Sequence, residues 1–418
     1  MARFGGRTRM ALALGFGAAL MAMPQPAGAA GPAIAGCSIF PVDNIWNARV
    51  DGLPVAASSA AWVSTIGTTR HMHPDFGAGM WDGAPIGIPF VTVPGDQAGV
   101  PVTFDYDDES DHGLYPVPEN PPIEGGPDSD GDRHILVLDT GHCVLYELYY
   151  AFPNGSGGWH AGSGAVFDLS SHALRPNTWT SADAAGLPIL PGLVRYDEVA
   201  AGEIRHAIRF TAPVTQKRHV WPARHDASSN TSTSVPPMGQ RFRLKASFDI
   251  SSFSPAMRVI LTAMKRYGII LADNGSAWYV SGAPDSRWND DDLVSSFHRI
   301  LGSAFEAVDT SSLMISADSG QARPAPLPPL PPAPPPPPPV KTYTLTVKVT
   351  GGPGTVISRI PGLRCSAGVC GASFPAGTQV TLMTSGGTLR DWSGDCSGRG
   401  ACVVTMTKAR SVTARFQP

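Results

Sequence analysis

The distribution of apolar and polar residues along this 418-residue chain predicts many short strands and few helices. Short apolar or alternating runs recur between clusters of glycine, proline, asparagine and aspartate, as is typical of strands joined by turns. Helical periodicity is found mainly in residues 255–267 and 290–300, each preceded by capping residues. We therefore expect a mainly β chain, with a β-sandwich or jelly-roll-like large domain and a few late helices. The strand-like runs are HILVLD, VLYELYYAF, GAVFDL, IRHAIRFTA, RFRLKASFD, IILADN and AWYVSG.

A proline-rich segment divides the chain into two parts. From Arg323 to Val340 the sequence is RPAPLPPLPPAPPPPPPV. Proline lacks an amide donor and has a fixed φ, so this segment favours an extended polyproline II spacer. We expect a large domain over residues 30–320, a linker over 321–340, and a small all-β module over 341–418.

The N-terminus has the pattern of a secretory signal peptide, expected to cover residues 1–29. Arg3, Arg7 and Arg9 precede an apolar stretch, and Ala27-Gly28-Ala29 forms a cleavage site. The apolar stretch is too short to span a bilayer, and no other segment is a candidate. We expect a secreted protein, extracellular or at the cell surface, without a transmembrane segment.

The six cysteines fit an oxidising compartment. Each side of the linker holds an even number of them, which favours disulfides within each part. No Cys-x-x-Cys motif occurs, which disfavours zinc. The expected pairs are Cys37–Cys143, Cys365–Cys370 and Cys396–Cys402.

Charge is distributed unevenly between the two parts. The C-terminal module holds nine basic and two acidic side chains, whereas the large domain holds 18 basic and 32 acidic ones. A basic module on an acidic domain is expected to approach an anionic partner, such as a polysaccharide or the cell-wall surface. Nucleic acid is a poor candidate because its phosphates would repel the large domain. The sequence leaves the oligomeric state open.

Three carboxylates in or beside the strand-like runs are candidate catalytic residues. Glu147 lies inside VLYELYY, where a buried carboxylate is costly unless it is paired. Asp132 precedes HILVLD, and Asp168 lies near the end of GAVFDL. Because paired carboxylates cleave glycosidic bonds, we expect Glu147 to exchange protons with Asp132 or Asp168. The alternative for Glu147 is a structural side chain that faces water or pairs with an arginine.

Aromatic and basic residues near these carboxylates are candidate substrate-binding groups. Trp159 and Trp179 can stack on sugar rings, although a tryptophan between two turns, as Trp179 is, can equally belong to the core. His134 and His160 lie beside the candidate acids. Arg243 shares a basic strand face that suits a uronate carboxylate or neutralises acids of its own domain.

The segment GPDSDGDRH suggests a calcium site. Asp128, Asp130 and Asp132 are spaced by two residues around a glycine, and such carboxylates can surround Ca²⁺. The glutamate that completes an EF-hand loop is missing. The alternative is a solvated acidic turn before a strand.

The C-terminal module resembles the divergent InlB B-repeat family of bacterial surface domains over residues 341–418. The resemblance rests on YTLTV, the GxGTV turn, FPAGTQVTL, WSGDCSG and CVVTMTKARSVTARF. It implies surface attachment and not catalysis.

Residues 37–315 resemble a group of secreted bacterial proteins of unassigned function. That resemblance rests on GPDSDGDRH, LRPNTWTSADAAGLPILPGLVRYDEV and YGIILADNGSAWYVSGAPDSRW. It implies a domain boundary and no chemistry.

Together these features predict a secreted polysaccharide hydrolase that uses general acid/base catalysis and is tethered by its C-terminal module. The first alternative is a non-enzymatic cell-surface or glycan-binding protein stabilised by calcium. The second is a lyase that uses histidine and tyrosine with a basic strand as the carboxylate clamp. A deep cleft with two carboxylates favours hydrolysis, whereas a shallow aromatic face favours binding.

Overall fold

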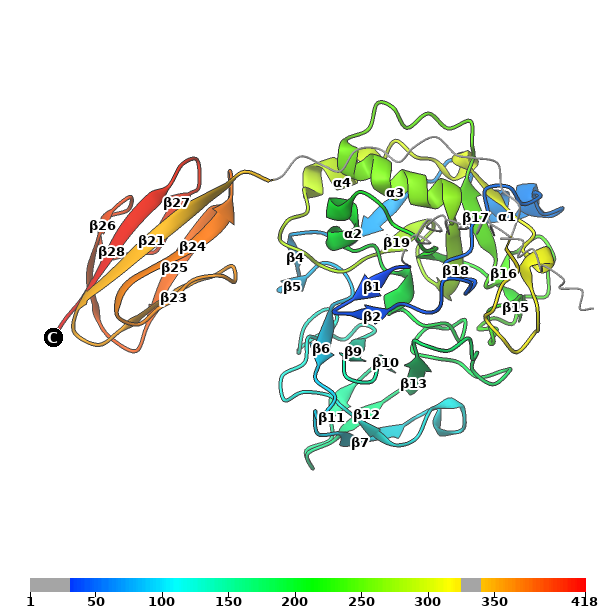
Figure 1. The fold of residues 1–418 in the computed structure, drawn as a ribbon, viewed down its shortest axis with the longest axis horizontal. Helices are drawn as coiled ribbons and strands as arrows, with labels where there is room; N and C mark the ends of the chain where they lie inside the picture. The colour runs from blue at the N-terminus through cyan, green and yellow to red at the C-terminus, as the bar shows by residue number, and fades with distance from the viewer. Residues whose placement is uncertain (1–30, 325–339) are drawn as a thin grey trace, which may run out of the picture.

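The computed structural model describes residues 31–324 and 340–418 (Figure 1). Strands dominate both ranges, so the expected mainly β fold with few helices is confirmed. The expected signal peptide lies outside the described residues, as does most of the proline run. No helix within the two described ranges is long and apolar enough to cross a membrane.

The largest sheet of the large domain has six strands and supports its main core. Two neighbouring pairs in it are parallel, β14 with β18 and β19 with β3, and the other pairs are antiparallel. Its buried side chains, among them Phe210, Phe242 and Trp278, pack ring against ring. Across the sheet the order is β20 (Phe305–Ala307), β17 (Arg241–Leu244), β18 (Ile269–Asn274), β14 (Ile208–Ala212), β19 (Tyr279–Ser281) and β3 (His73–Asp75).

Two helices lie where periodicity predicts them. Helix α3 (Pro255–Arg266) packs against β17, and the hydroxyl of Ser254 caps it by accepting a hydrogen bond from the Met257 amide. Helix α4 (Asp290–Phe297) is capped in the same way by Asn289. The remaining helices were not predicted from the sequence: α1 (Ser59–Ile66), α2 (Tyr196–Ala201), and the 3₁₀ turns η1 (Asp107–Glu109), η2 (Leu190–Gly192), η3 (Gly302–Ala304) and η4 (Ser311–Leu313).

A second sheet of four strands is buried on both faces. In β9, Leu136 and Leu138 belong to the main core, whereas Ile135 and Val137 belong to a smaller core on the opposite face. A strand covered on both sides needs apolar residues at every position, which explains the unbroken ILVL run. The order across this sheet is β13 (Ser163–Asp168), β10 (Val144–Tyr149), β9 (Ile135–Asp139) and β6 (Phe90–Val93).

The smaller core lies against a third sheet, and short strand pairs complete the large domain. The third sheet contains β11 (Phe152–Pro153), β12 (Trp159–Ala161), β7 (Val100–Phe104) and β8 (Leu114–Tyr115). The short pairs are β1 (Ala33–Ile34) with β2 (Cys37–Ser38), β4 (Met80–Trp81) with β5 (Ala84–Pro85), and β15 (Gln216–His219) with β16 (Pro237–Met238).

The large domain extends slightly beyond the boundary expected at residue 320. The amide of Ala322 donates to the Asp43 carbonyl, and the amide of Arg323 donates to the Leu313 carbonyl. These hydrogen bonds attach the start of the expected linker to the large domain. The proline-rich sequence therefore follows directly after Arg323, the last residue that these hydrogen bonds attach.

The C-terminal module consists of two four-stranded sheets around one core that includes Leu345, Val347, Trp392 and Val412. Disulfides Cys365–Cys370 and Cys396–Cys402 form as expected. One sheet contains β24 (Gly368–Pro375), β21 (Thr342–Gly351), β28 (Arg410–Phe416) and β26 (Leu389–Gly394). The other contains β23 (Arg364–Cys365), β22 (Thr355–Ser358), β25 (Gln379–Ser385) and β27 (Cys402–Thr405).

The third expected disulfide, Cys37–Cys143, joins β2 to the start of β10 across a sequence separation of 106 residues. A crosslink that closes a loop of this length restricts the unfolded chain strongly. The bond therefore holds the N-terminal hairpin against the doubly buried sheet.

Replacing both Cys37 and Cys143 by serine should lower the free energy of unfolding of the large domain by about 3–5 kcal/mol, because the unfolded chain regains its loop entropy. Urea unfolding followed by tryptophan fluorescence measures the change. The matched control is Cys365→Ser with Cys370→Ser, whose loop lies in the other module and which should leave the large-domain transition unchanged. An unaltered transition in the first double variant would contradict the stabilising role.

Candidate functional site

A polar hollow of about 390 Å³ lies where the doubly buried sheet meets the six-stranded sheet. Asp132 enters it from the turn before β9, Tyr149 from the end of β10, and Asp273 from β18. Tyr106 and Glu109 contribute from the segment after β7. The hollow therefore draws its side chains from elements that are far apart in the sequence.

A buried arginine, Arg209, lies behind Asp273, one of the residues that line this hollow. Arg209 on β14 donates two hydrogen bonds to the Asp183 carboxylate, from Nε at 2.7 Å and from Nη2 at 2.8 Å. Nη1 donates to the Ser281 hydroxyl at 2.5 Å, and Nη2 lies 3.3 Å from Oδ2 of Asp273. Such a two-pronged contact fixes both planar groups, and it compensates a charge that is costly to bury alone. Asp273 is thereby tied to a rigid support.

His134 supplies a second buried positive charge. Its Nδ1 contacts the Glu124 carboxylate, and its Nε2 lies 2.9 Å from the Ala182 carbonyl oxygen. Both partners are acceptors, so both ring nitrogens donate and the imidazole is protonated. Burial opposes this charge, but the Glu124 carboxylate outweighs burial and raises the pKa of His134 to about 9.

Carboxylates outnumber the cations around this hollow, so some of them retain protons. Burial and the neighbouring Asp183 charge raise the pKa of Asp273 to about 7, although Arg209 opposes the shift. Asp75 on β3 remains partly open to solvent. The surrounding protein still removes hydration from its carboxyl group and, with the Glu124 charge, raises its pKa. The site thus holds one carboxyl group, that of Asp273, with a pKa near neutrality.

Asp132 is the solvent-exposed carboxylate of the hollow. One ligand atom from each of Glu124, Asp132 and His134 lies within 4.8 Å of the others, the one such group found in the described ranges. A metal-binding histidine needs a free lone pair, and both ring nitrogens of His134 donate to oxygen acceptors. The residues therefore do not fit a metal ion in this arrangement.

The three carboxylates predicted to hold calcium, Asp128, Asp130 and Asp132, do not come together as a group of metal ligands in the part of the chain that the structure describes. The guanidinium of Arg133 fills the turn, and its Nη1 donates to the carbonyls of Pro127 at 2.8 Å and Ser129 at 2.9 Å. A cation site would need these inward carbonyls as ligands. The alternative of an exposed acidic turn describes the segment better.

Glu147 lies in the protein interior and not in the hollow. Its side chain has no exposed surface, and its carboxylate accepts hydrogen bonds of 2.9–3.0 Å from the amides of Ile189 and Leu190. Burial raises its pKa to about 7, although these amides oppose the shift. With no exposed surface, Glu147 is placed to anchor the turn at η2 and not to contact substrate. This corrects the expected pairing with Asp132 or Asp168.

Asp168 also lies apart from the hollow. It ends β13, whereas Ser163 at the other end of that strand lines the hollow. Five residues of strand span roughly 17 Å. The carboxylate of Asp168 accepts hydrogen bonds from the amide and hydroxyl of Ser170. It is an exposed turn residue in this structure.

Some of the candidate substrate-binding residues lie near the hollow, and the others lie elsewhere in the domain. His134 does not line the hollow but contacts the carbonyl of Ala182, which does. Trp159 is buried in the smaller core, and exposed His160 lies 3.1 Å from Asp105 on the third sheet. Trp179 is half-buried next to Thr180, which lines the hollow. Arg243 pairs with Glu306, so its positive charge is neutralised within the domain.

Sequence reasoning missed Asp75, Asp183, Arg209 and Asp273. The sequence held a signal for Asp183 and Asp273. Each of the three runs on which the resemblance of residues 37–315 rests contributes a residue to this site. GPDSDGDRH carries Asp132 and His134, the second run carries Asp183, and the third carries Asp273. Three separate sequence runs therefore meet at one place in the fold.

No family model matches this chain, and neither a curated protein nor a solved structure shows significant similarity to it. The functional argument accordingly rests on the geometry and charges of the site.

Replacing Glu147 by glutamine should make stability less dependent on pH. The folded-state pKa of about 7 exceeds the usual value of 4.5, so folding takes up a proton between these values. The wild-type free energy of unfolding should therefore fall as the pH rises from about 5 to about 8, and Glu147→Gln should reduce that slope.

Urea unfolding at a series of pH values measures this effect. Asp168→Asn is the control, because it removes an exposed carboxylate and should leave the slope unchanged. An equally steep slope in Glu147→Gln would show that this carboxyl group does not take up the proton.

Proposed function

We propose that the protein is a secreted polysaccharide hydrolase that uses general acid/base catalysis in the hollow between its two main sheets. The observation that carries the proposal is the pairing of two different carboxyl groups in one hollow. Asp273 is held by Arg209 and retains its proton near neutral pH, whereas Asp132 faces solvent. Glycosidic hydrolysis needs such a pair of carboxyl groups in different environments.

In the proposed reaction, Asp273 gives its proton to the glycosidic oxygen as the bond between that oxygen and the sugar carbon breaks. A water molecule adds to the carbon, and Asp132 takes the proton that the water releases. Arg209 then compensates the charge left on Asp273. A nearby fixed cation lowers the free energy of such a developing carboxylate.

The walls of the hollow suit a sugar. Tyr106 lines it with about half of its side chain exposed, which offers a flat apolar face beside a hydroxyl. Tyr149, Thr180, Ser181 and Asn274 add polar groups. Tyr106 takes the stacking role that the sequence assigned to Trp159 and Trp179.

The C-terminal module is proposed as an InlB B-repeat-like unit that attaches the protein to an anionic surface. Most of its basic side chains are exposed, including Lys348, Arg359, Arg390 and Arg399. Only Asp391 and Asp395 oppose them within the module. The disulfides, the signal-like N-terminus and this basic module all suit an exported protein.

The variants Asp273→Asn and Asp132→Asn should each lower kcat by about 10²- to 10⁴-fold, because each removes one partner in proton transfer. Release of reducing ends from a panel of acidic and neutral polysaccharides measures the rate. Asp168→Asn, which alters a carboxylate outside the hollow, should retain wild-type turnover. Absence of release from every polysaccharide would favour the non-enzymatic glycan-binding alternative.

The pH dependence of kcat/KM should report the proton on Asp273. A general acid must be protonated in the free enzyme, so activity should fall as the pH rises above about 7. The residual activity of Asp273→Asn should lack this alkaline limb. A wild-type profile that stays flat from about pH 6 to about pH 9 would reject Asp273 as the acid.

A further inference from the structure

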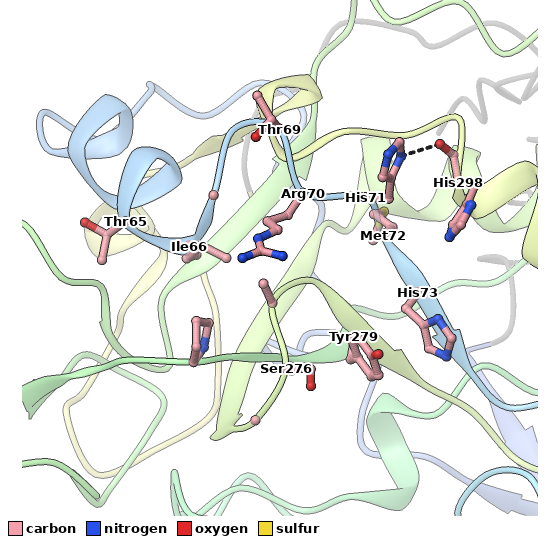
Figure 2. A pocket seen from close by; sticks show the side chains of 14 residues that line it. Thr65, Ile66, Thr69, Arg70, His71, Met72, His73, Ser276, Tyr279 and His298 are labelled. Atoms are coloured by element: carbon pink, nitrogen blue, oxygen red, sulfur yellow. Dashed lines mark hydrogen bonds between the residues drawn. The ribbon is translucent and has the colours of Figure 1, made fainter.

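A second hollow, of about 820 Å³, lies on the other side of the β18–β19 turn (Figure 2). Asp273 and Asn274 line the first hollow, and the next residues, Gly275 to Ala277, line the second. The turn is held close to β14, because a side-chain carbon at Gly275 would lie 2.9 Å from the Thr211 hydroxyl. The two hollows are therefore lined by consecutive residues of one turn.

The ionisable side chains around the second hollow are Arg70, His71, His73, His298 and Tyr279. No aspartate or glutamate of the described residues lines it. This is unusual in a domain with 32 acidic and 18 basic side chains. Figure 2 shows Arg70 extending into the middle of the hollow, with the three histidines and Tyr279 grouped along one side.

Arg70 lacks the carboxylate partner that several other arginines of the domain have. Arg175, Arg209, Arg243 and Arg287 each form an ion pair with a carboxylate. The Arg70 side chain has no hydrogen bond or ion pair within the described ranges, although it is exposed in a hollow. An unpaired guanidinium there offers five hydrogen-bond donors and a permanent positive charge.

The local backbone determines the orientation of the Arg70 side chain. A carbon added at Gly67 would lie only 2.5 Å from Cγ of Arg70, so the arginine stem packs directly against the glycine. Gly67 has φ of 122°, a conformation that other residues rarely adopt. The histidines are also held, because His71 bonds to the His298 carbonyl and the His73 ring stacks on Tyr279 at 4.2 Å. The hollow is thus arranged before any ligand arrives.

We propose that this second hollow binds the anionic group of a glycan, a uronate carboxylate or a phosphate, through Arg70. The inference rests on the proposed hydrolase function and names its substrate class as an acidic polysaccharide. Arg70 is a substrate-binding residue here, and the adjacent hydroxyls of Ser276 and Thr69 provide further donors. Sugar units on either side of the β18–β19 turn would then occupy the two hollows together.

Isothermal titration calorimetry of the full mature chain tests the inference directly. The probes are trigalacturonate, inorganic phosphate and the neutral maltotriose, each at low and at high salt. We expect at least one anion to bind more tightly than maltotriose and its affinity to fall as salt rises. Arg70→Ala should weaken that binding tenfold or more. Arg218→Ala, an exposed arginine of β15 outside both hollows, should bind like wild type.

These measurements test the proposed anion site separately from the proposed hydrolase activity. Binding of trigalacturonate alone identifies the group as a uronate, and binding of phosphate alone identifies a phosphate. Anion binding that Arg70→Ala abolishes, without turnover of any polysaccharide, supports the site and contradicts the hydrolase. Wild-type anion affinity in Arg70→Ala, or no anion binding at all, overturns the inference even if neutral polysaccharides are hydrolysed.

Discussion

The contact between Arg209 and Asp183 is the interaction on which the candidate site depends. It buries a full positive charge between two sheets, and such a charge is tolerated only with close, well-directed partners. Asp183 comes from a long loop and Arg209 from the central region of the six-stranded sheet. Their pairing therefore fixes the loop on the sheet and places Ser281 and Asp273, which lines the hollow, around the same guanidinium.

Glu147 and Asp273 show why a shifted pKa alone does not identify a catalytic group. Burial raises both pKa values to about 7. The Glu147 carboxylate is enclosed by protein and its oxygens accept backbone amides, so its shift reflects the anchoring of a turn. Asp273 combines the same shift with access to a hollow that a second carboxylate shares. Accessibility, and not the size of the shift, separates the two.

The sequence predicted local features better than the site. Helices α3 and α4, several strands such as β9, β10 and β18, and all three disulfides were predictable, because period, caps and cysteine parity are local or countable signals. Asp132 was also found, because it lies in an acidic turn. Its partner Asp273 was not, because only the pairing of β18 with β14 brings it to Arg209. An isolated aspartate at the end of an apolar strand gives no indication of that partner.

The net negative charge of the large domain opposes the binding of acidic polymers, and local charge resolves this conflict. At physiological ionic strength the screening length is about 8 Å, so charges on distant faces contribute little within a hollow. Arg70 lies in a hollow that no aspartate or glutamate of the described residues lines. The basic C-terminal module adds a second cationic surface. An anionic glycan thus meets positive charge at both places where binding is proposed, the second hollow and the C-terminal module.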